Sequence, residues 1–313
     1  MRYYLIRRIL LVLPVSWAIG TFIFLVVRVL PGDPAMAILG DYATPQALAE
    51  LREQLGLNYP LWRQYFFFFR DILSLNLGKS MISGMPVGSM IARAFPYTLE
   101  LVVTSMSLSV IIGIPLGLMT ALRRNTIYDY LGRLFSILGL SVPDYCLGIV
   151  LILVFSIGLG WLPMMGGGDA DNFLKRIPYL VLPAITLALI VAAFITRMTR
   201  STMLEIMGLP YIRTARSKGL RETVVIYKHA LRNAFIPIIT VVGVYLNVLL
   251  GGTVLVEIIF SRPGLGKMIV GAIMDRDYML LQSLLFVFSF LIVFINLAID
   301  IVYKIIDPRI KYK

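Results

Sequence analysis

The sequence predicts an all-α membrane protein with six transmembrane helices. Of its 313 residues, 59% are hydrophobic and only 15% are charged. A soluble protein is roughly 45–50% apolar and roughly 25% charged, so both values depart towards a membrane protein. This composition excludes a soluble globular enzyme, a disordered chain and a nucleic-acid-binding domain, although the net charge is +12.

Six apolar stretches are long enough to span a bilayer, which takes roughly 20 helical residues. A helix satisfies its own backbone hydrogen bonds in lipid, and the alternation of a barrel strand is not seen in these stretches. In the second stretch, Gly113 and Gly117 have a spacing that allows close helix contact, although glycine is also simply common in membrane helices. The stretches are residues 9–30, 97–121, 133–159, 178–198, 235–256 and 283–303.

The first stretch has some features of a secretory signal. Arg7 and Arg8 precede it, and Ala35-Met36-Ala37 resembles a cleavage site. The apolar part of a signal peptide is only 7–15 residues long, however, whereas this one has about 22. We therefore expect a retained first helix.

Lysine and arginine place both termini in the cytoplasm. An even number of spans puts both ends of the chain on one side. With the N-terminus inside, the cytoplasmic segments hold 18 of the 29 basic residues. The outer loops carry ten basic and ten acidic residues and are neutral, as the positive-inside rule requires.

The predicted organisation has four parts. Residues 1–30 form the N-terminal tail and the first helix, and residues 31–96 form a small extracytoplasmic cap between helices 1 and 2. Residues 97–303 form the core with helices 2–6 and include a cytoplasmic loop at 201–234. Residues 304–313 form a cytoplasmic tail.

Two short helices are expected in the cap. Thr44 is a candidate N-cap for a helix that begins at Pro45 and ends before Gly56. The run from Trp62 to Leu75 is too short to span, which predicts an interfacial or packed helix.

The loop at 201–234 is polar, basic and predicted to be cytoplasmic. A helical pattern from Tyr211 to Ser217 is followed by Gly219, which can adopt a left-handed conformation and end a helix. A second helix is expected from Arg221 to Asn233. On composition alone, an ordinary basic cytoplasmic loop bound by lipid headgroups is the favoured interpretation.

This loop resembles the EAA loop in permease subunits of ATP-binding-cassette (ABC) importers, especially in the peptide-permease branch. Arg213, Thr214, His229 and Arg232 depart from the general pattern but match that branch. The matching strings in the loop are Tyr211, Arg213-Thr214-Ala215-Arg216, Lys218-Gly219-Leu220 and His229-Ala230-Leu231-Arg232-Asn233-Ala234, with Ile236-Pro237.

The likeness extends over nearly the whole chain. Further matching strings are Leu30-Pro31-Gly32-Asp33-Pro34, Ser141-Val142-Pro143, Gly160-Trp161-Leu162-Pro163 and Arg262-Pro263-Gly264-Leu265-Gly266. The sequence is similar to the B-type permease subunit of dipeptide/oligopeptide importers in the peptide/nickel family. The resemblance implies the type I importer permease fold and the bacterial inner membrane.

The resemblance also implies partners and a coupling site. The partners are a homologous C-type permease, two nucleotide-binding ATPase subunits, an extracytoplasmic substrate-binding protein and membrane lipid. The loop is the coupling helix that docks on an ATPase. Its candidate residues are Glu205, Tyr211, Arg213, Thr214, Ala215, Arg216, Lys218, Gly219, Leu220, Glu222, His229 and Arg232.

Ionisable residues in the spans are candidates for lining a transport path. Pro143 removes a backbone donor and predicts a kink in the third span, directly before Asp144. A helix-to-helix hydrogen bond or solvation at the interface is the alternative role for each candidate. The candidates are Glu100, Pro143, Asp144, Glu257 and Asp300.

The chain is expected to be a transport subunit and not an enzyme. Its nearest approach to a phosphate-binding loop, Gly264-Leu265-Gly266-Lys267, has Ser261 in place of the first glycine and Met268 after the lysine. ATP and magnesium are therefore expected only in the partner ATPases, with no cofactor in this chain. Cys146 and His229, each the only one of its type, leave no disulfide and no ordinary zinc cluster.

Short peptides are the expected substrate, with glutathione, a nickel chelate or a sugar acid as alternatives in the same importer class. An ion-gradient-driven secondary transporter would predict paired acids at mid-membrane and inverted repeats. A membrane-embedded enzyme would predict convergent Asp, His or Ser side chains at one depth. A receptor or scaffold is a further alternative.

Overall fold

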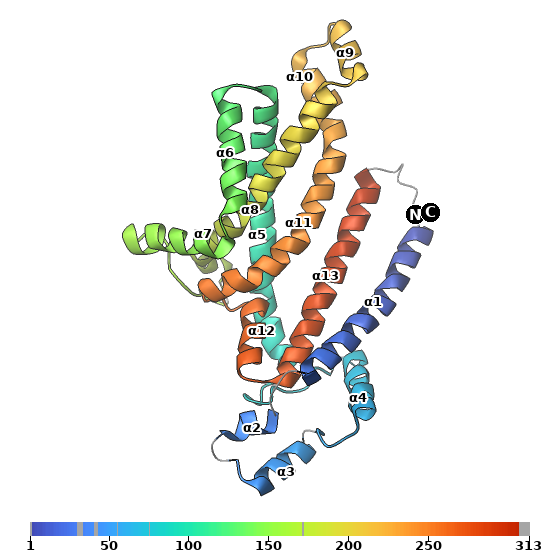
Figure 1. The fold of residues 1–313 in the computed structure, drawn as a ribbon, viewed down its shortest axis with the longest axis vertical. Coiled ribbons are helices and arrows are strands. Elements are labelled where there is room, and N and C mark those ends of the chain that lie inside the picture. Colours follow the sequence, from blue (N-terminus) through green and yellow to red (C-terminus); the bar gives the residue numbers. More distant parts are fainter. Residues whose placement is uncertain are drawn as a thin grey trace. The chain divides into compact units, whose positions relative to one another are not determined.

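A computed structural model describes residues 2–29, 34–40, 43–54, 56–74, 76–170 and 172–306, and every regular element in these ranges is helical (Figure 1). This confirms the all-α class for the described residues. The elements are α1 (Arg2–Val29), α2 (Pro34–Leu39), α3 (Pro45–Gln54), α4 (Leu61–Leu73), α5 (Val87–Leu122), α6 (Ile127–Ser141), α7 (Asp144–Leu151), η2 (Ile152–Gly158), α8 (Phe173–Met207), α9 (Pro210–Ser217), α10 (Glu222–Val224), η3 (Val225–Leu231), α11 (Arg232–Ile259), α12 (Leu265–Met274) and α13 (Tyr278–Ile306). Residues 30–33, Leu55 and the tail after Ile306 lie outside the described residues.

Four of the described helical runs are long and apolar enough to cross a membrane. They are Val87–Leu122, Phe173–Met207, Glu222–Ile259 and Tyr278–Ile301. Counting the bent pair α6 and α7 as one span makes five, and Leu11–Val27 of α1 is a shorter apolar helix. The count of six spans and the cytoplasmic placement of the termini stay predictions.

The chain forms two compact units. Unit 1 comprises Met1–Tyr97 with Pro263–Leu297, and unit 2 comprises Thr98–Arg262 with Ala298–Lys313. In unit 1 an apolar cluster joins α1, α5, α12 and α13 through buried side chains that include Val27, Ile91, Ile269 and Leu281.

Asp277 fastens the start of α13 in unit 1. Its carboxylate accepts hydrogen bonds from the Leu280 backbone N–H at 3.1 Å and from the Ser80 hydroxyl at 2.5 Å. The Met81 N–H donates to the same carboxylate at 3.1 Å. An aspartate that satisfies the first N–H groups of a helix is a typical N-cap. Here it also ties the segment before α5 to α13.

Pro143 breaks the third predicted span. α6 and α7 meet at 104°, and α7 leaves the direction of α6 sideways (Figure 1). Val142 is extended, with φ −92° and ψ 121°, because the ring of a following proline disfavours helical backbone. The predicted interruption at Pro143 is confirmed and is larger than a kink, since the segment contains two helices bent by 104°. That residues 133–159 cross the membrane as one span stays a prediction.

Two glycines let α5 lie directly against α8 in unit 2. A Cβ on Gly113 would lie 2.9 Å from the Ala192 carbonyl oxygen, and one on Gly117 would lie 2.7 Å from that of Thr196. Both distances are shorter than any normal Cβ contact, so only glycine allows the two backbones to approach this closely. The close helix contact predicted from the Gly113–Gly117 spacing is confirmed, and its partner is α8.

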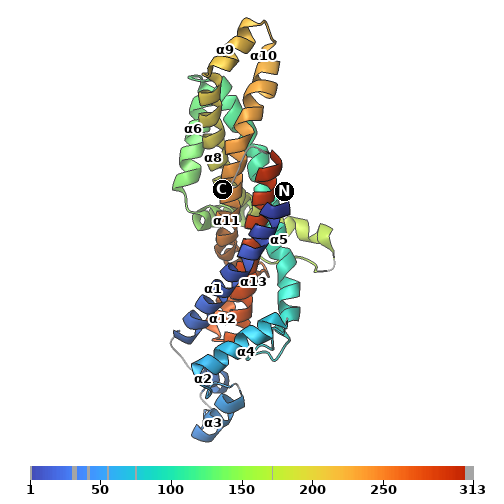
Figure 2. The ribbon, with the colours of Figure 1, turned by 90° about the vertical axis from the view of Figure 1, so that its right-hand side faces the viewer.

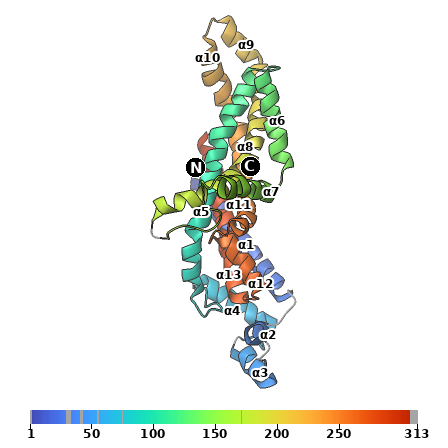
Figure 3. The ribbon, with the colours of Figure 1, turned by 90° about the vertical axis from the view of Figure 1, so that its left-hand side faces the viewer.

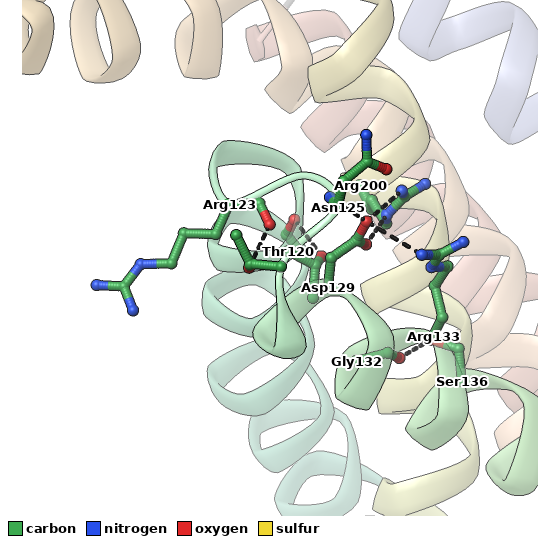
Figure 4. Close-up of polar contacts among 10 residues, drawn as sticks. Thr120, Arg123, Asn125, Asp129, Gly132, Arg133, Ser136 and Arg200 are labelled. Atoms are coloured by element: carbon green, nitrogen blue, oxygen red, sulfur yellow. Dashed lines mark hydrogen bonds and ion pairs between the residues drawn. The ribbon is translucent and has the colours of Figure 1, made fainter.

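A buried aspartate joins α6 to α8 in the same unit (Figure 4). Arg200 of α8 donates to both carboxylate oxygens of Asp129, at 2.7 and 3.0 Å. The Asn125 backbone N–H donates at 3.0 Å, and Arg133 approaches to 3.4 Å. A bidentate guanidinium–carboxylate pair fixes orientation as well as distance. Figure 3 shows α6 running alongside α8, and this pair holds them together where α8 approaches the 201–234 loop.

Gly117→Ala is expected to lower the melting temperature of the purified protein, because the new Cβ would collide with the α8 backbone at Thr196. Overpacking of this kind costs roughly 1–3 kcal/mol. Gly251→Ala on α11 is the matched control, because no atom lies within 4 Å of a Cβ built there. Alanine is also the better helix former, so the control should be neutral or stabilising. Thermal unfolding in detergent measures both, and equal melting temperatures would contradict the close contact.

Asp129→Asn is expected to cost about 3 kcal/mol of unfolding free energy, because it leaves Arg200 without its carboxylate. Arg133→Gln is the control, with a cost below about 1 kcal/mol, since that pair is longer and the Arg133 side chain is 42% exposed. A double-mutant cycle with Arg200→Gln isolates the pair. Strictly additive costs would show that Asp129 and Arg200 are not coupled.

Candidate functional site

The predicted coupling loop is a compact helical element between α8 and α11. α8 ends at Met207, and α9 begins at Pro210, a position where a helix needs no N–H donor. After the turn, α10 and η3 continue into α11 without a break, so the second predicted helix and the fifth predicted span form one helical run. In unit 2, α9 and α10 extend beyond the end of α6 (Figures 1 and 2).

One face of α9 is fixed to the helices beneath it. Ile212 and Ala215 are buried in an apolar cluster with Met203 and Ile206 of α8 and Val225 of η3. Close-packed side chains of this kind shift as a unit and do not bend continuously. A force on α9 is therefore transmitted directly to α8 and α11.

Gly219 ends the helix and turns the chain, as the sequence predicts. Its φ is +74°, and no atom lies within 4 Å of a Cβ built there, so the conformation and not the space requires glycine. The Gly219 N–H donates to the Arg216 carbonyl at 2.9 Å, and the Leu220 N–H donates to the Ala215 carbonyl at 3.4 Å. These bonds satisfy carbonyl groups that the end of α9 would otherwise leave without donors.

An ion pair between two residues of the loop joins the two sides of the turn. Arg216 donates to the two carboxylate oxygens of Glu222 at 2.6 and 3.2 Å. The hydrogen bond to Glu222 raises the pKa of Arg216. Both residues are among the candidates for contact with an ATPase, and the structure pairs them with each other across Gly219. Asn233 donates to the Tyr211 hydroxyl at 3.1 Å and so links the two arms of the loop.

The outward surface of the loop carries several basic side chains and two exposed apolar ones. Tyr211 and Leu220 are each 41% exposed, whereas Ala215 is buried and His229 is half-buried. Such a surface can pair with acidic groups of a partner and insert two apolar anchors. The other exposed candidates are Glu205, Arg213, Thr214, Arg216, Lys218, Gly219, Glu222 and Arg232.

Glu100 lies in a charge cluster in unit 2. Its carboxylate pairs with Arg176 at 3.0 Å and with Arg262 at 2.9 Å. Arg262 is completely buried, and it also approaches the Tyr179 carbonyl at 3.5 Å. Two guanidinium groups around one carboxylate compensate a buried charge. In this structure Glu100 therefore joins α5 to α8 and to the chain after α11.

The other path candidates differ in burial and in their contacts. Glu257 is fully buried near the end of α11 and accepts a hydrogen bond from Thr98 at 2.6 Å. Asp144 is the first residue of α7 and accepts from the Tyr145 N–H at 2.8 Å. Asp300 is half-buried on α13, and Pro143 is exposed before α7. Arg262 links two of the five candidates, because its side chain pairs with Glu100 at 2.9 Å and its backbone N–H donates to the Glu257 carbonyl at 2.8 Å.

Four charged residues of these clusters were not recognised from the sequence: Asp129, Arg176, Arg200 and Arg262. An acid in an apolar span signals that a partner exists. The signal does not say which partner, and Arg262 is 162 positions away from Glu100. Within the described ranges, no group of three or more His, Cys, Asp and Glu side chains is placed to hold a metal ion.

Comparison with known proteins assigns both parts of the chain. The family model "Binding-protein-dependent transport system inner membrane component" matches residues 113–312, and the model of the N-terminal region of such components matches residues 1–102.

The relatives match along their whole length. The chain is 41% identical to the dipeptide transport system permease protein DppB of Alkalihalophilus pseudofirmus, over 99% of both chains. It is 41% identical to the glutathione transport system permease protein GsiC of Escherichia coli K12, over 99% of both chains. It is also 41% identical to the probable peptide ABC transporter permease protein y4tP of Sinorhizobium fredii, over 100% of both.

The fold has a counterpart among solved structures. A chain of the MetNI methionine ABC transporter in an inward-facing conformation matches with a TM-score of 0.56 and 20% identity, covering 71% of this chain and 98% of that one. With the family models and the full-length relatives, the conclusion follows that the chain belongs to the family of binding-protein-dependent transport system inner membrane components, the permease subunits of ABC importers.

Proposed function

We propose that this permease subunit forms, with a second homologous permease, the translocation path for short peptides delivered by an extracytoplasmic binding protein. The observation that carries the proposal is the packing of α9, a short basic helix that is held on α8 and α11 through Ile212 and Ala215. The relatives named above are, by name, a dipeptide permease, a probable peptide permease and a glutathione permease. Glutathione is itself a tripeptide, so these substrates share peptide bonds and charged termini.

The partners follow from this function. Two ATPase subunits bind ATP and magnesium, and one of them receives α9 and the exposed face of the loop. The complex lies in the bacterial inner membrane with α9 on the cytoplasmic side. Side chains of the loop have two different roles in this proposal. Ile212 and Ala215 hold α9 to the permease, whereas Tyr211, Arg213, Lys218 and Leu220 face the ATPase.

Coupling proceeds through contacts within unit 2. Closure of the ATPases displaces α9, and the buried cluster passes the displacement to α8. Arg200 is bonded to Asp129 of α6, and α8 is also in backbone contact with Gly113 and Gly117 of α5. The three helices therefore shift together, which opens or closes the path as a rigid-body movement.

Among the five path candidates, Asp144 is the best placed to meet substrate. It is half-exposed at the break between α6 and α7, and it lies 3.5 Å from a Cβ built on Gly252 of α11. A carboxylate there would attract the ammonium group of a peptide. Glu100 and Glu257 are already bonded within unit 2 and serve as structural ties in this proposal.

Glutathione, a nickel chelate or a sugar acid remain alternative substrates within the same importer class. An ion-gradient-driven transporter is a weaker alternative. Co-purification with an ATPase separates it from the importer.

Gly219→Ala is expected to reduce transport-coupled ATP hydrolysis several-fold in vesicles that contain the whole complex. A left-handed conformation costs an alanine roughly 1–2 kcal/mol, which reorients α9. Gly84→Ala is the matched control, because Gly84 has φ +68° and equally open space but lies in unit 1, outside the loop. Equal loss in both variants would mean that the effect is general strain and not coupling.

Arg216→Glu is expected to uncouple the complex because it places a carboxylate against Glu222. The exchange Arg216→Glu with Glu222→Arg restores the internal pair and should recover part of the activity. ATPase assembly is measured by co-purification, and hydrolysis by phosphate release. If the exchange recovers nothing, Arg216 acts on the partner directly and not by closing the turn.

The substrate is tested by stimulation of ATP hydrolysis in the reconstituted complex. A dipeptide mixture with the binding protein is expected to stimulate hydrolysis more strongly than glutathione or a nickel chelate. Asp144→Asn should weaken the response to dipeptides with free amino ends more than the response to N-acetylated ones. Stimulation by glutathione alone would replace the peptide assignment, and absence of any associated ATPase would reject the importer.

A further inference from the structure

Helix α4 in unit 1 exposes a stripe of large apolar side chains. Trp62, Phe66 and Leu73 are 72%, 64% and 82% exposed. They lie four and seven positions apart, so they share one face of the helix. No residue of the helix is fully buried.

A second face of α4 packs on α1. Tyr65 and Thr21 share a hydrogen bond of 2.8 Å between their hydroxyl groups, and the Tyr65 ring lies edge-on to Phe24 with centroids 5.4 Å apart. A Cβ on Gly20 would lie 3.0 Å from the Phe69 ring. Figure 1 shows α4 next to the end of α1, and the two helices are in contact. The contacts fall at residues 20–24 of a helix that ends at Val29.

These contacts fix the depth of α4 if α1 crosses the membrane with its N-terminus inside. At a rise of 1.5 Å per residue, Phe24 lies about 5 Å before Val27, the last residue of the apolar stretch of α1, so the contacts with α4 fall within that stretch. α1 itself exposes apolar side chains along this half, among them Phe22 at 67% and Leu25 at 53%. The stripe on α4 and the outer half of α1 therefore both present exposed apolar side chains.

Two arginines lie beside the stripe. Arg63 and Arg70 are seven positions apart and share a face. The Arg63 guanidinium lies 4.2 Å from the Tyr59 ring centre, and that of Arg70 lies 4.8 Å from the Phe67 ring centre. An apolar stripe bordered by arginine is typical of a helix in a membrane interface, where the guanidinium groups reach lipid phosphate.

We infer that α4 is an interfacial helix of the outer leaflet, with Trp62, Phe66 and Leu73 among the acyl chains and Arg63 at the phosphates, whereas Arg70 is paired with Asp71 at 2.9 Å. A soluble partner is a poorer occupant, because a stripe of this size would stand in water whenever that partner is away. The inference rests on the predicted topology of α1 and does not depend on the importer activity or its substrate.

The test uses the fluorescence of Trp62 in the full complex. Trp17→Phe and Trp161→Phe leave Trp62 as the only tryptophan of this chain. The second permease and the ATPase subunits are prepared as variants without tryptophan. The protein is reconstituted in phosphatidylcholine vesicles brominated either near the headgroup end or near the methyl end of the acyl chains. The matched control carries Trp62→Phe and Glu50→Trp, which moves the tryptophan to the exposed polar helix α3.

Emission from Trp62 is expected to fall roughly two-fold with bromine near the headgroup end, with a smaller fall for the deeper bromine, as for a shallow interfacial helix. The Glu50→Trp control should keep its emission in both lipids and lose it to iodide in the water. Size-exclusion elution must match the unsubstituted complex. Unchanged Trp62 emission in both brominated lipids would overturn the inference, and so would shielding from iodide that appears only after the binding protein is added.

Discussion

The close approach of α5 to α8 at Gly113 and Gly117 is the contact on which unit 2 depends. In lipid, helices gain little from hiding apolar surface, because acyl chains are as apolar as leucine. Their association relies on packing and on interhelical hydrogen bonds, both of which need short distances. Glycine supplies the distance at two successive turns of α5, and Gly139 of α6 approaches Ala193 of α8 in the same way. α8 thus becomes the helix against which its neighbours are placed.

Charges secure this packing at two levels of α5. At the first level, Glu100 of α5 pairs with Arg176 and Arg262. At the second level, twenty residues further along α5, Thr120 lies against Gly132 of α6. Gly132 is one helical turn from Asp129, which pairs with Arg200. At 1.5 Å per residue, the two levels are about 30 Å apart, which equals the thickness of the hydrocarbon layer. The apolar helix surfaces between them are free of ion pairs in the contacts described here. This spacing fits a unit whose paired charges lie near the two membrane surfaces.

The coupling loop combines internal rigidity with an exposed surface. Gly219 sets the turn, the Arg216–Glu222 pair closes it, and Ile212 and Ala215 hold α9 to the helices below. The remaining cations and the two apolar side chains Tyr211 and Leu220 are left outward. This internal rigidity is what the proposed coupling role requires, because a rigid helix passes a displacement to the helices it packs on. α4 differs in kind, since its outward side chains are apolar and its arginines lie beside them.

The sequence alone determined the properties that depend on neighbouring residues. Apolar length predicted the helices, Gly219 predicted the turn, and the Gly113–Gly117 spacing predicted a close contact, because each follows from local backbone geometry. The angle at Pro143 was underestimated, since a proline specifies that a helix is interrupted but the packing around it decides how far the chain turns. The partners of Glu100 and Asp129 were set only by the tertiary structure. Pairing across 162 and 71 positions depends on which helices lie side by side, and no local pattern encodes that.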